Sequence, residues 1–95
     1  MQLDEIHGFE WDEAKRQVNL AKHGIDFLQA SVALAGGRLD IHSYRHNEHR
    51  VIGVCMGTEQ LIAVVFTMRN GICRIISARV ARENERRAYR QIYAG

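Results

Sequence analysis

Arginine is the residue type best suited to chemistry in this sequence, and it is concentrated in the last third of the chain. Residues 69–95 hold seven arginines, no lysine and two acidic residues, whereas residues 1–68 hold six basic and nine acidic residues. The overall charge of +2 therefore divides into +5 and −3. The planar guanidinium group binds phosphate or carboxylate oxygens through paired hydrogen bonds. The distribution predicts an anionic partner, but charge alone does not identify it.

Arg79 is a candidate for anion binding, because it lies at the end of an expected strand, next to an arginine-rich helix. Side chains alternate between the two faces of a strand, so a regular strand sends Arg74 and Arg79 to opposite faces. Only a bulge would bring both to one ligand. The alternative is that Arg79 is a half-exposed strand arginine whose stem covers apolar surface.

A second feature is a stripe of arginines on the last expected helix, formed by Arg82, Arg86 and Arg90. Like charges at this spacing cost about 0.2–0.5 kcal/mol per pair. Glu83 can offset part of this cost through Arg86 or Arg87. The stripe indicates either an anion, which could be RNA phosphate or an acidic protein, or an ordinary solvated helix face.

Histidines offer two further possibilities. His23 follows Lys22 at the end of an expected helix, where it either complements the helix dipole or acts as a general acid or base. A second group, His42, His46 and His49, has spacing that raises the possibility of zinc. Its segment is not an expected helix and no cysteine completes it, so a solvated loop is the favoured interpretation and no metal or cofactor is expected.

The elements that must position these residues follow from hydrophobic periodicity. Helices are expected over 12–23, from 26 to near 36, and over 81–93; strands are expected over 9–11, 39–42, 51–56, 61–68 and 72–79. The apolar residues Ala14, Val18 and Ala21 recur at helical spacing in the first of these helices. Asn70-Gly71 predicts a two-residue hairpin turn that pairs Arg69 with Ile72 and, further along, Val65 with Ile76. The predicted fold class is α+β, a mainly antiparallel sheet with helices packed on it.

Length and composition limit the function classes. The 95 residues suit one domain spanning 1–95. The longest apolar run, residues 61–66, is far shorter than the roughly 20 residues of a membrane span. The first residues lack the features of a signal peptide, and two cysteines are too few for a disulfide scaffold. We therefore expect a cytoplasmic protein without a membrane partner.

Three segments resemble the BrnT family of ribonuclease toxins from type II toxin–antitoxin modules, which is related in fold to RelE. The first comprises Phe9-Glu10-Trp11-Asp12, Lys15, Asn19, Lys22-His23-Gly24-Ile25 and Phe27. The second is His46-Asn47-Glu48-His49-Arg50, in which His49 stands where many members carry an acidic residue. The third comprises Arg74-Ile75-Ile76-Ser77-Ala78-Arg79, Ala81, Glu85-Arg86 and Tyr89.

The resemblance implies a RelE-like sheet and a toxin that cleaves RNA without metal and so inhibits translation. It also implies a BrnA-type antitoxin with a ribbon-helix-helix part, a hetero-oligomer with that antitoxin, and operator DNA bound only through it. A non-catalytic module whose arginine-rich face binds an acidic protein or nucleic acid is the alternative.

The resemblance also suggests which residues act. RNA cleavage without metal needs a deprotonated ribose 2′-oxygen, stabilisation of the phosphorane and protonation of the 5′-oxygen. We expect phosphate binding by Arg69, Arg79 and Arg82, and proton transfer by His23 or Glu48. Further RNA contacts are expected from Lys22, Arg74, Arg86 and Tyr89. The interpretation of Tyr89 as an aromatic residue at the edge of the core is at least as good. The antitoxin is expected to cover Arg82, Arg86 and Arg90.

Overall fold

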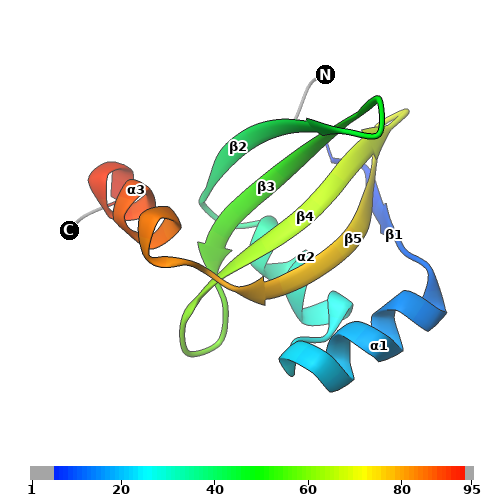
Figure 1. Ribbon diagram of the computed structural model, residues 1–95, viewed down its shortest axis with the longest axis horizontal. Coiled ribbons are helices and arrows are strands. Elements are labelled where there is room, and N and C mark those ends of the chain that lie inside the picture. The colour runs from blue at the N-terminus through cyan, green and yellow to red at the C-terminus, as the bar shows by residue number, and fades with distance from the viewer. Residues whose placement is uncertain (1–5, 94–95) are drawn as a thin grey trace.

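The computed structural model describes residues 6–93 and confirms the α+β class (Figure 1). The helices are α1 (Glu13–His23), α2 (Phe27–Leu34) and α3 (Glu83–Tyr93). The strands are β1 (Gly8–Glu10), β2 (Arg38–Arg45), β3 (Glu48–Met56), β4 (Leu61–Arg69) and β5 (Ile72–Val80). They form one sheet in the order β1-β5-β4-β3-β2, in which β1 runs parallel to β5 and the other neighbours are antiparallel.

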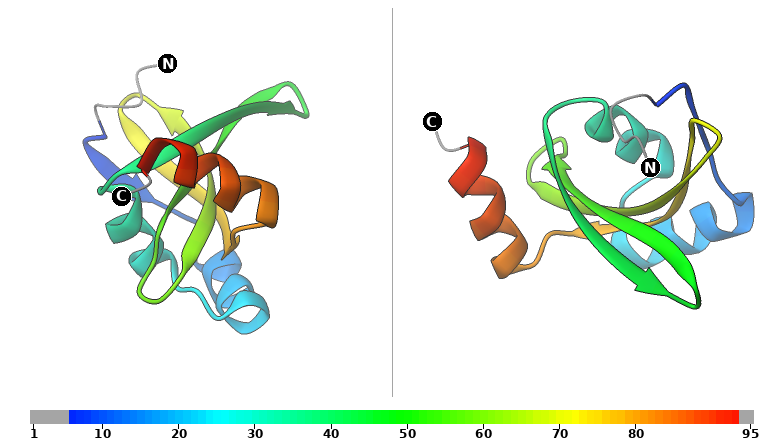
Figure 2. Two further views of the ribbon diagram at one scale, coloured as in Figure 1. Left: turned by 90° about the vertical axis from the view of Figure 1, so that its left-hand side faces the viewer. Right: turned by 90° about the horizontal axis from the view of Figure 1, so that it is seen from above.

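The sheet is strongly twisted, and the helices lie at different places around it (Figures 1 and 2). The α2 helix packs on one face, over β3 and β5, and α1 lies along β5. The α3 helix stands apart from both and contacts β2 and β3. None of the helices within residues 6–93 is long and apolar enough to cross a membrane.

Each face of the sheet has its own apolar cluster. On the α2 face, Phe27 and Leu34 pack against Val64, Phe66 and Ile75. On the opposite face, Val54, Leu61 and Ala81 form a smaller cluster, completed by Tyr89 of α3. The α3 helix covers only this smaller cluster, so part of the face that points away from α2 stays uncovered. We call this part the open face.

Two tight turns fix the strand register. His46 and Asn47 both have positive φ, 51° and 58°, and join β2 to β3 as a two-residue hairpin. Asn70 and Gly71, with φ of 54° and 80°, join β4 to β5 in the same way. Positive φ at both central positions is the geometry of the type I′ turn, which suits the twist of paired strands. The predicted pairing of Arg69 with Ile72 is therefore confirmed.

Further along this hairpin the predicted pairing is wrong, because β5 contains a bulge. Phe66 lies opposite Ile75, but Val65 lies opposite Ser77, which leaves Ile76 without a partner on β4. The extra residue reverses the alternation of every later side chain. Arg74 and Arg79 consequently share the open face although an odd number of residues separates them, and Cys73, Ile75 and Ala78 share the buried one.

The two N-terminal helices begin where the sequence predicts, each directly after a capping aspartate. The Asp12 carboxylate accepts a hydrogen bond from the Lys15 amide, and the Asp26 carboxylate accepts one from the Leu28 amide. The apolar spacing in α1 marks an exposed side, however, because Val18 is 65% exposed while Asn19 is buried. The Asn19 side chain bonds the amide and carbonyl of Ala78, so that it pairs with the edge of β5 as a short strand would.

Candidate functional site

The open face carries a cleft that is rich in arginine and contains no acidic residue in its lining. Its volume is about 390 Å³, and its lining residues are Ser43, Arg45, Arg50, Ile52, Val65, Ile76, Ser77, Arg79 and Arg82. Ile52, Val65 and Ser77 are successive cross-strand partners on β3, β4 and β5 and belong to its walls. We call this site the arginine cleft.

Local structure explains why four arginines meet there. Arg45 and Arg50 flank the β2–β3 turn, and period-2 alternation brings both to the open face. Arg79 reaches the same face because of the bulge at Ile76. Arg82 lies between β5 and α3, where the chain leaves the sheet. The site thus depends on the β2–β3 turn, on the bulge at Ile76 and on the segment that joins β5 to α3.

Arg79 is held by a buried carboxylate. Its two terminal nitrogens donate to the two oxygens of Glu85, at 2.8 and 2.9 Å. Glu85 Oε1 also accepts the main-chain N–H of Arg82 at 2.7 Å. The hydrogen bond from Arg79, opposed by burial, lowers the pKa of Glu85 and keeps its carboxylate charged. Arg79 therefore also has a structural role, because its removal would leave Glu85 buried without its charge partner.

The other arginines of the cleft differ in their partners. Arg50 donates to Glu48 at 3.2 Å, and Glu48 also accepts from Arg69 at 3.3 Å. The hydrogen bond from Arg50 lowers the pKa of Glu48 most, and the hydrogen bond from Arg69 lowers it further. Arg45 and Arg82 have no side-chain hydrogen bond or ion pair with any residue in 6–93. Their guanidinium groups can donate hydrogen bonds to an external anion without giving up a hydrogen bond or ion pair inside the protein.

Several predicted site residues lie outside the lining of the cleft. Arg69 is bound to Glu48, and Arg74 is bound to Glu10 at 3.0 Å. Arg86 donates to Glu83 and to the Ala81 carbonyl, which is the offset expected for the arginine stripe. Three further candidates also lie elsewhere: Glu48 on β3, and Tyr89 and Arg90 on α3. Tyr89 stacks on Tyr93 and packs on the smaller apolar cluster, in agreement with its interpretation as an edge-of-core residue.

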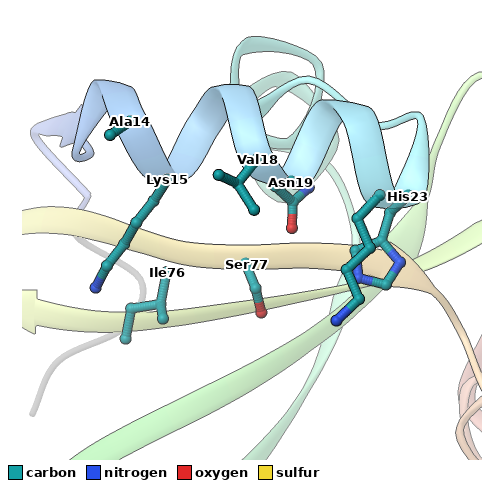
Figure 3. A pocket seen from close by; sticks show the side chains of 8 residues that line it. Ala14, Lys15, Val18, Asn19, His23, Ile76 and Ser77 are labelled. Atoms are coloured by element: carbon teal, nitrogen blue, oxygen red, sulfur yellow. The ribbon is translucent and has the colours of Figure 1, made fainter.

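Lys22 and His23 line a separate groove on the other side of β5, about 340 Å³ in volume (Figure 3). The remaining lining residues of this groove are Ala14, Lys15, Val18, Asn19, Ile76 and Ser77. Ile76 and Ser77 therefore belong to both cavities. We call this site the α1 groove.

The histidine cluster is only partly brought together. His42 Nδ1 and His49 Nε2 lie 2.8 Å apart, and Tyr44 stacks on His49. His46 lies in the turn, and no group of three potential metal ligands occurs among the described residues. Burial raises the pKa of both thiols, Cys55 and Cys73, to about 12, so neither is a thiolate nucleophile at neutral pH.

Sequence reasoning missed Ser43, Arg45, Arg50 and Ser77 as members of the site. Asn47 was the signal for Arg45 and Arg50, because asparagine favours a tight turn. A two-residue turn at this point makes both predicted strands longer, so that Arg45 and Arg50 lie close to each other on neighbouring strands. The signal for Ser77 was weaker, because its face depends on the bulge.

Comparison with known families identifies the chain. Residues 11–85 match the family described as "Ribonuclease toxin, BrnT, of type II toxin-antitoxin system". No curated protein matches the chain. The matched segment includes all four arginines of the arginine cleft and all of α1. The chain therefore belongs to the BrnT family of ribonuclease toxins, whose members act in type II toxin–antitoxin systems with an antitoxin partner.

Proposed function

We propose that this protein is an endoribonuclease that cleaves RNA without a metal ion and thereby inhibits translation. The observation that carries the proposal is the arginine cleft, which is lined by four arginines and no acidic residue. Such a site suits a phosphodiester and would bind a metal cation poorly. Fixed guanidinium groups stabilise charge that grows on phosphate oxygens in the transition state.

The proposed reaction is attack of a ribose 2′-oxygen on the adjacent phosphorus. The 2′-hydroxyl gives up its proton, the 2′-oxygen bonds to phosphorus, and the bond from phosphorus to the 5′-oxygen breaks. The products are a 2′,3′-cyclic phosphate and a 5′-hydroxyl that has taken up a proton. We assign stabilisation of the phosphorane to Arg45, Arg50, Arg79 and Arg82.

His23 and Glu48 remain the proposed proton carriers. His23 lines the groove that shares Ser77 with the arginine cleft, so substrate that spans β5 would pass near both. Glu48 is bound to Arg50 and, with its lowered pKa, is an acceptor rather than a donor at neutral pH. Electrostatic support would come from Lys22, which lines the α1 groove, and at longer range from Arg69, Arg74 and Arg86.

The proposed partner is a BrnA-type antitoxin that covers Arg82, Arg86 and Arg90 and forms a hetero-oligomer with the toxin. The position of α3 favours this assignment, because the helix stands apart from α1 and α2 and its Ile92 is 60% exposed (Figure 1). Arg82 also lines the arginine cleft, so a protein seated there would block RNA entry. Operator DNA would be bound only through the antitoxin.

The experiment that tests the catalytic proposal is degradation of a labelled RNA in excess EDTA. We expect cleavage to persist and to leave 2′,3′-cyclic phosphate ends. Activity that disappears and returns with zinc would contradict the proposal and direct attention to His42 and His49. RNA binding without cleavage under any condition would favour the alternative, a non-catalytic binding module.

The antitoxin assignment predicts association that is steered by charge. Neutralisation of the exposed Arg90 by Arg90→Gln should slow association with the antitoxin, and the on-rate should fall as salt rises. Arg16→Gln is the control, because Arg16 lies on α1, away from α3, where it is bound to Glu13 and to Asp26. Stopped-flow measurements at two salt concentrations test this. Equal on-rates for both variants would place the inhibitory contact away from α3.

A further inference from the structure

The α1 groove has properties that phosphate binding alone does not explain. One part of its lining is apolar and comes from Ala14, Val18 and Ile76. Val18 is 65% exposed and Ala14 is also exposed, so α1 turns an apolar strip toward solvent. Figure 3 shows Val18 between α1 and β5, with Ile76 and Ser77 on the strand across from it.

The rest of the lining is basic and polar. Lys15 and Lys22 contribute ammonium groups, and the lining contains no carboxylate. Neither lysine forms a side-chain ion pair with a residue in 6–93, where every salt bridge is made by an arginine. The groove thus combines an apolar contact with cations that form no ion pair within residues 6–93. A nucleotide, with its planar base and its phosphate, has the matching combination.

The groove also adjoins the arginine cleft. Ile76 and Ser77 line both, and Ile76 is the residue that the bulge leaves without a partner on β4. Only β5 separates the two cavities, and strands in a sheet lie about 4.8 Å apart. One nucleotide is longer than this width. A single RNA strand can therefore have a phosphate on one side of β5 and a neighbouring base on the other.

We propose that the α1 groove is a base-binding subsite for the nucleotide next to the phosphate held in the arginine cleft. This inference rests on the proposed function. The base lies against Val18 and Ile76, and Lys15 and Lys22, which lie about two helical turns apart on α1, each bind a phosphate beside it. The Ser77 hydroxyl and the His23 ring are the groups within the lining that can hydrogen-bond base edges. The subsite gives the enzyme a preference at one nucleotide position.

The test measures binding of short fluorescent 2′-O-methyl RNAs, which cannot be cleaved because the attacking hydroxyl is blocked. An abasic nucleotide is placed at each position in turn. We expect one position at which loss of the base weakens binding about tenfold. Val18→Ala should remove most of that effect, because the base then loses the apolar contact that distinguishes it.

Leu20→Ala is the matched control, since Leu20 is another exposed apolar residue of α1 but does not line the groove. It should preserve the abasic profile, and both variants should melt like the wild type. Wild-type cleavage combined with a flat abasic profile would overturn the base subsite alone. Wild-type failure both to bind and to cleave RNA would overturn the proposed function as well. An unchanged abasic profile in Val18→Ala with weakened antitoxin binding would assign the groove to the antitoxin and overturn the proposal.

Discussion

The four arginines of the arginine cleft form two pairs with different surroundings. Arg50 and Arg79 are bound to carboxylates, whereas Arg45 and Arg82 have no side-chain partner within residues 6–93. The contrast shows that arginines in one cluster can have different roles, depending on whether a carboxylate binds them. The bound arginines are positioned in advance but also stabilise the fold. Arg82 lies close enough to Glu85 to help lower the pKa of that carboxyl, but neither Arg45 nor Arg82 is fixed by a bond, so their substitution should affect activity more than stability.

The largest expected effect is on stability, at Arg79, one of the two arginines that are bound to a carboxylate. Arg79→Ala should lower the free energy of unfolding by about 3 kcal/mol, because Glu85 remains buried without its charge partner. Urea denaturation measures this value. Arg79→Ala combined with Glu85→Gln should recover part of the loss, since a neutral amide is less costly to bury. Unfolding of Arg79→Ala at the wild-type urea concentration would show that the ion pair contributes no stability.

The same pair predicts a dependence of stability on pH. Arg79 holds the pKa of Glu85 below its ordinary value of 4.5, so the carboxylate is more readily ionised in the folded protein than in the unfolded one. The stabilisation is therefore complete above about pH 4.5 and is lost as pH falls through the lower folded-state value. Melting curves from pH 6 to pH 3 should decline less in Arg79→Ala than in the wild type. Parallel declines would contradict this linkage.

A smaller effect is expected where α1 meets β5. Asn19→Ala should destabilise the protein by about 2 kcal/mol, because the buried Ala78 amide loses its acceptor. Asn19 also lines the α1 groove and not the arginine cleft, so RNA recognition in the groove should suffer more than phosphate binding. Hydrogen exchange at the Ala78 amide reports the change directly. An unaltered exchange rate would mean that Asn19 does not tie α1 to the sheet.

The smallest effect is expected at an exposed ion pair of α3. Arg87 approaches Glu83 at 3.8 Å, and both side chains are largely exposed. Solvent screens such a pair, so Arg87→Gln should shift the melting temperature by no more than about 1 °C. A large shift would show that exposure is a poor guide to which arginines stabilise the protein.

Much of the fold was predictable because local rules determined it. Asn70-Gly71 fixes the β4–β5 turn, and Asp12 and Asp26 begin their helices as expected. The bulge at Ile76 was not predictable, because its position depends on how β5 accommodates its neighbours and not on any residue type in the strand. Since the bulge determines which arginines meet, the composition of the cleft could not be derived from alternation alone.

The buried face of α1 could not be predicted from the sequence for a different reason. Apolar spacing normally marks the buried face of a helix, but α1 lies along the part of β5 that the short β1 leaves unpaired, and it buries Asn19 instead of Val18. The amide side chain satisfies backbone groups at that edge, which an apolar residue cannot do. The α1 groove became recognisable only when the position of α1 beside β5 was known.

The central claim is that the arginine cleft binds the scissile phosphate, and the cleavage rate of Arg82→Gln in EDTA tests it most directly. Loss of one charge-assisted hydrogen bond, about 1.5–3 kcal/mol, corresponds to a rate about 10- to 100-fold lower. Arg90→Gln is the control, because Arg90 lies on α3 outside the cleft lining. We predict a strong loss of rate for Arg82→Gln at an unchanged melting temperature and nearly wild-type cleavage for Arg90→Gln. Equal rates for the two variants would contradict the claim.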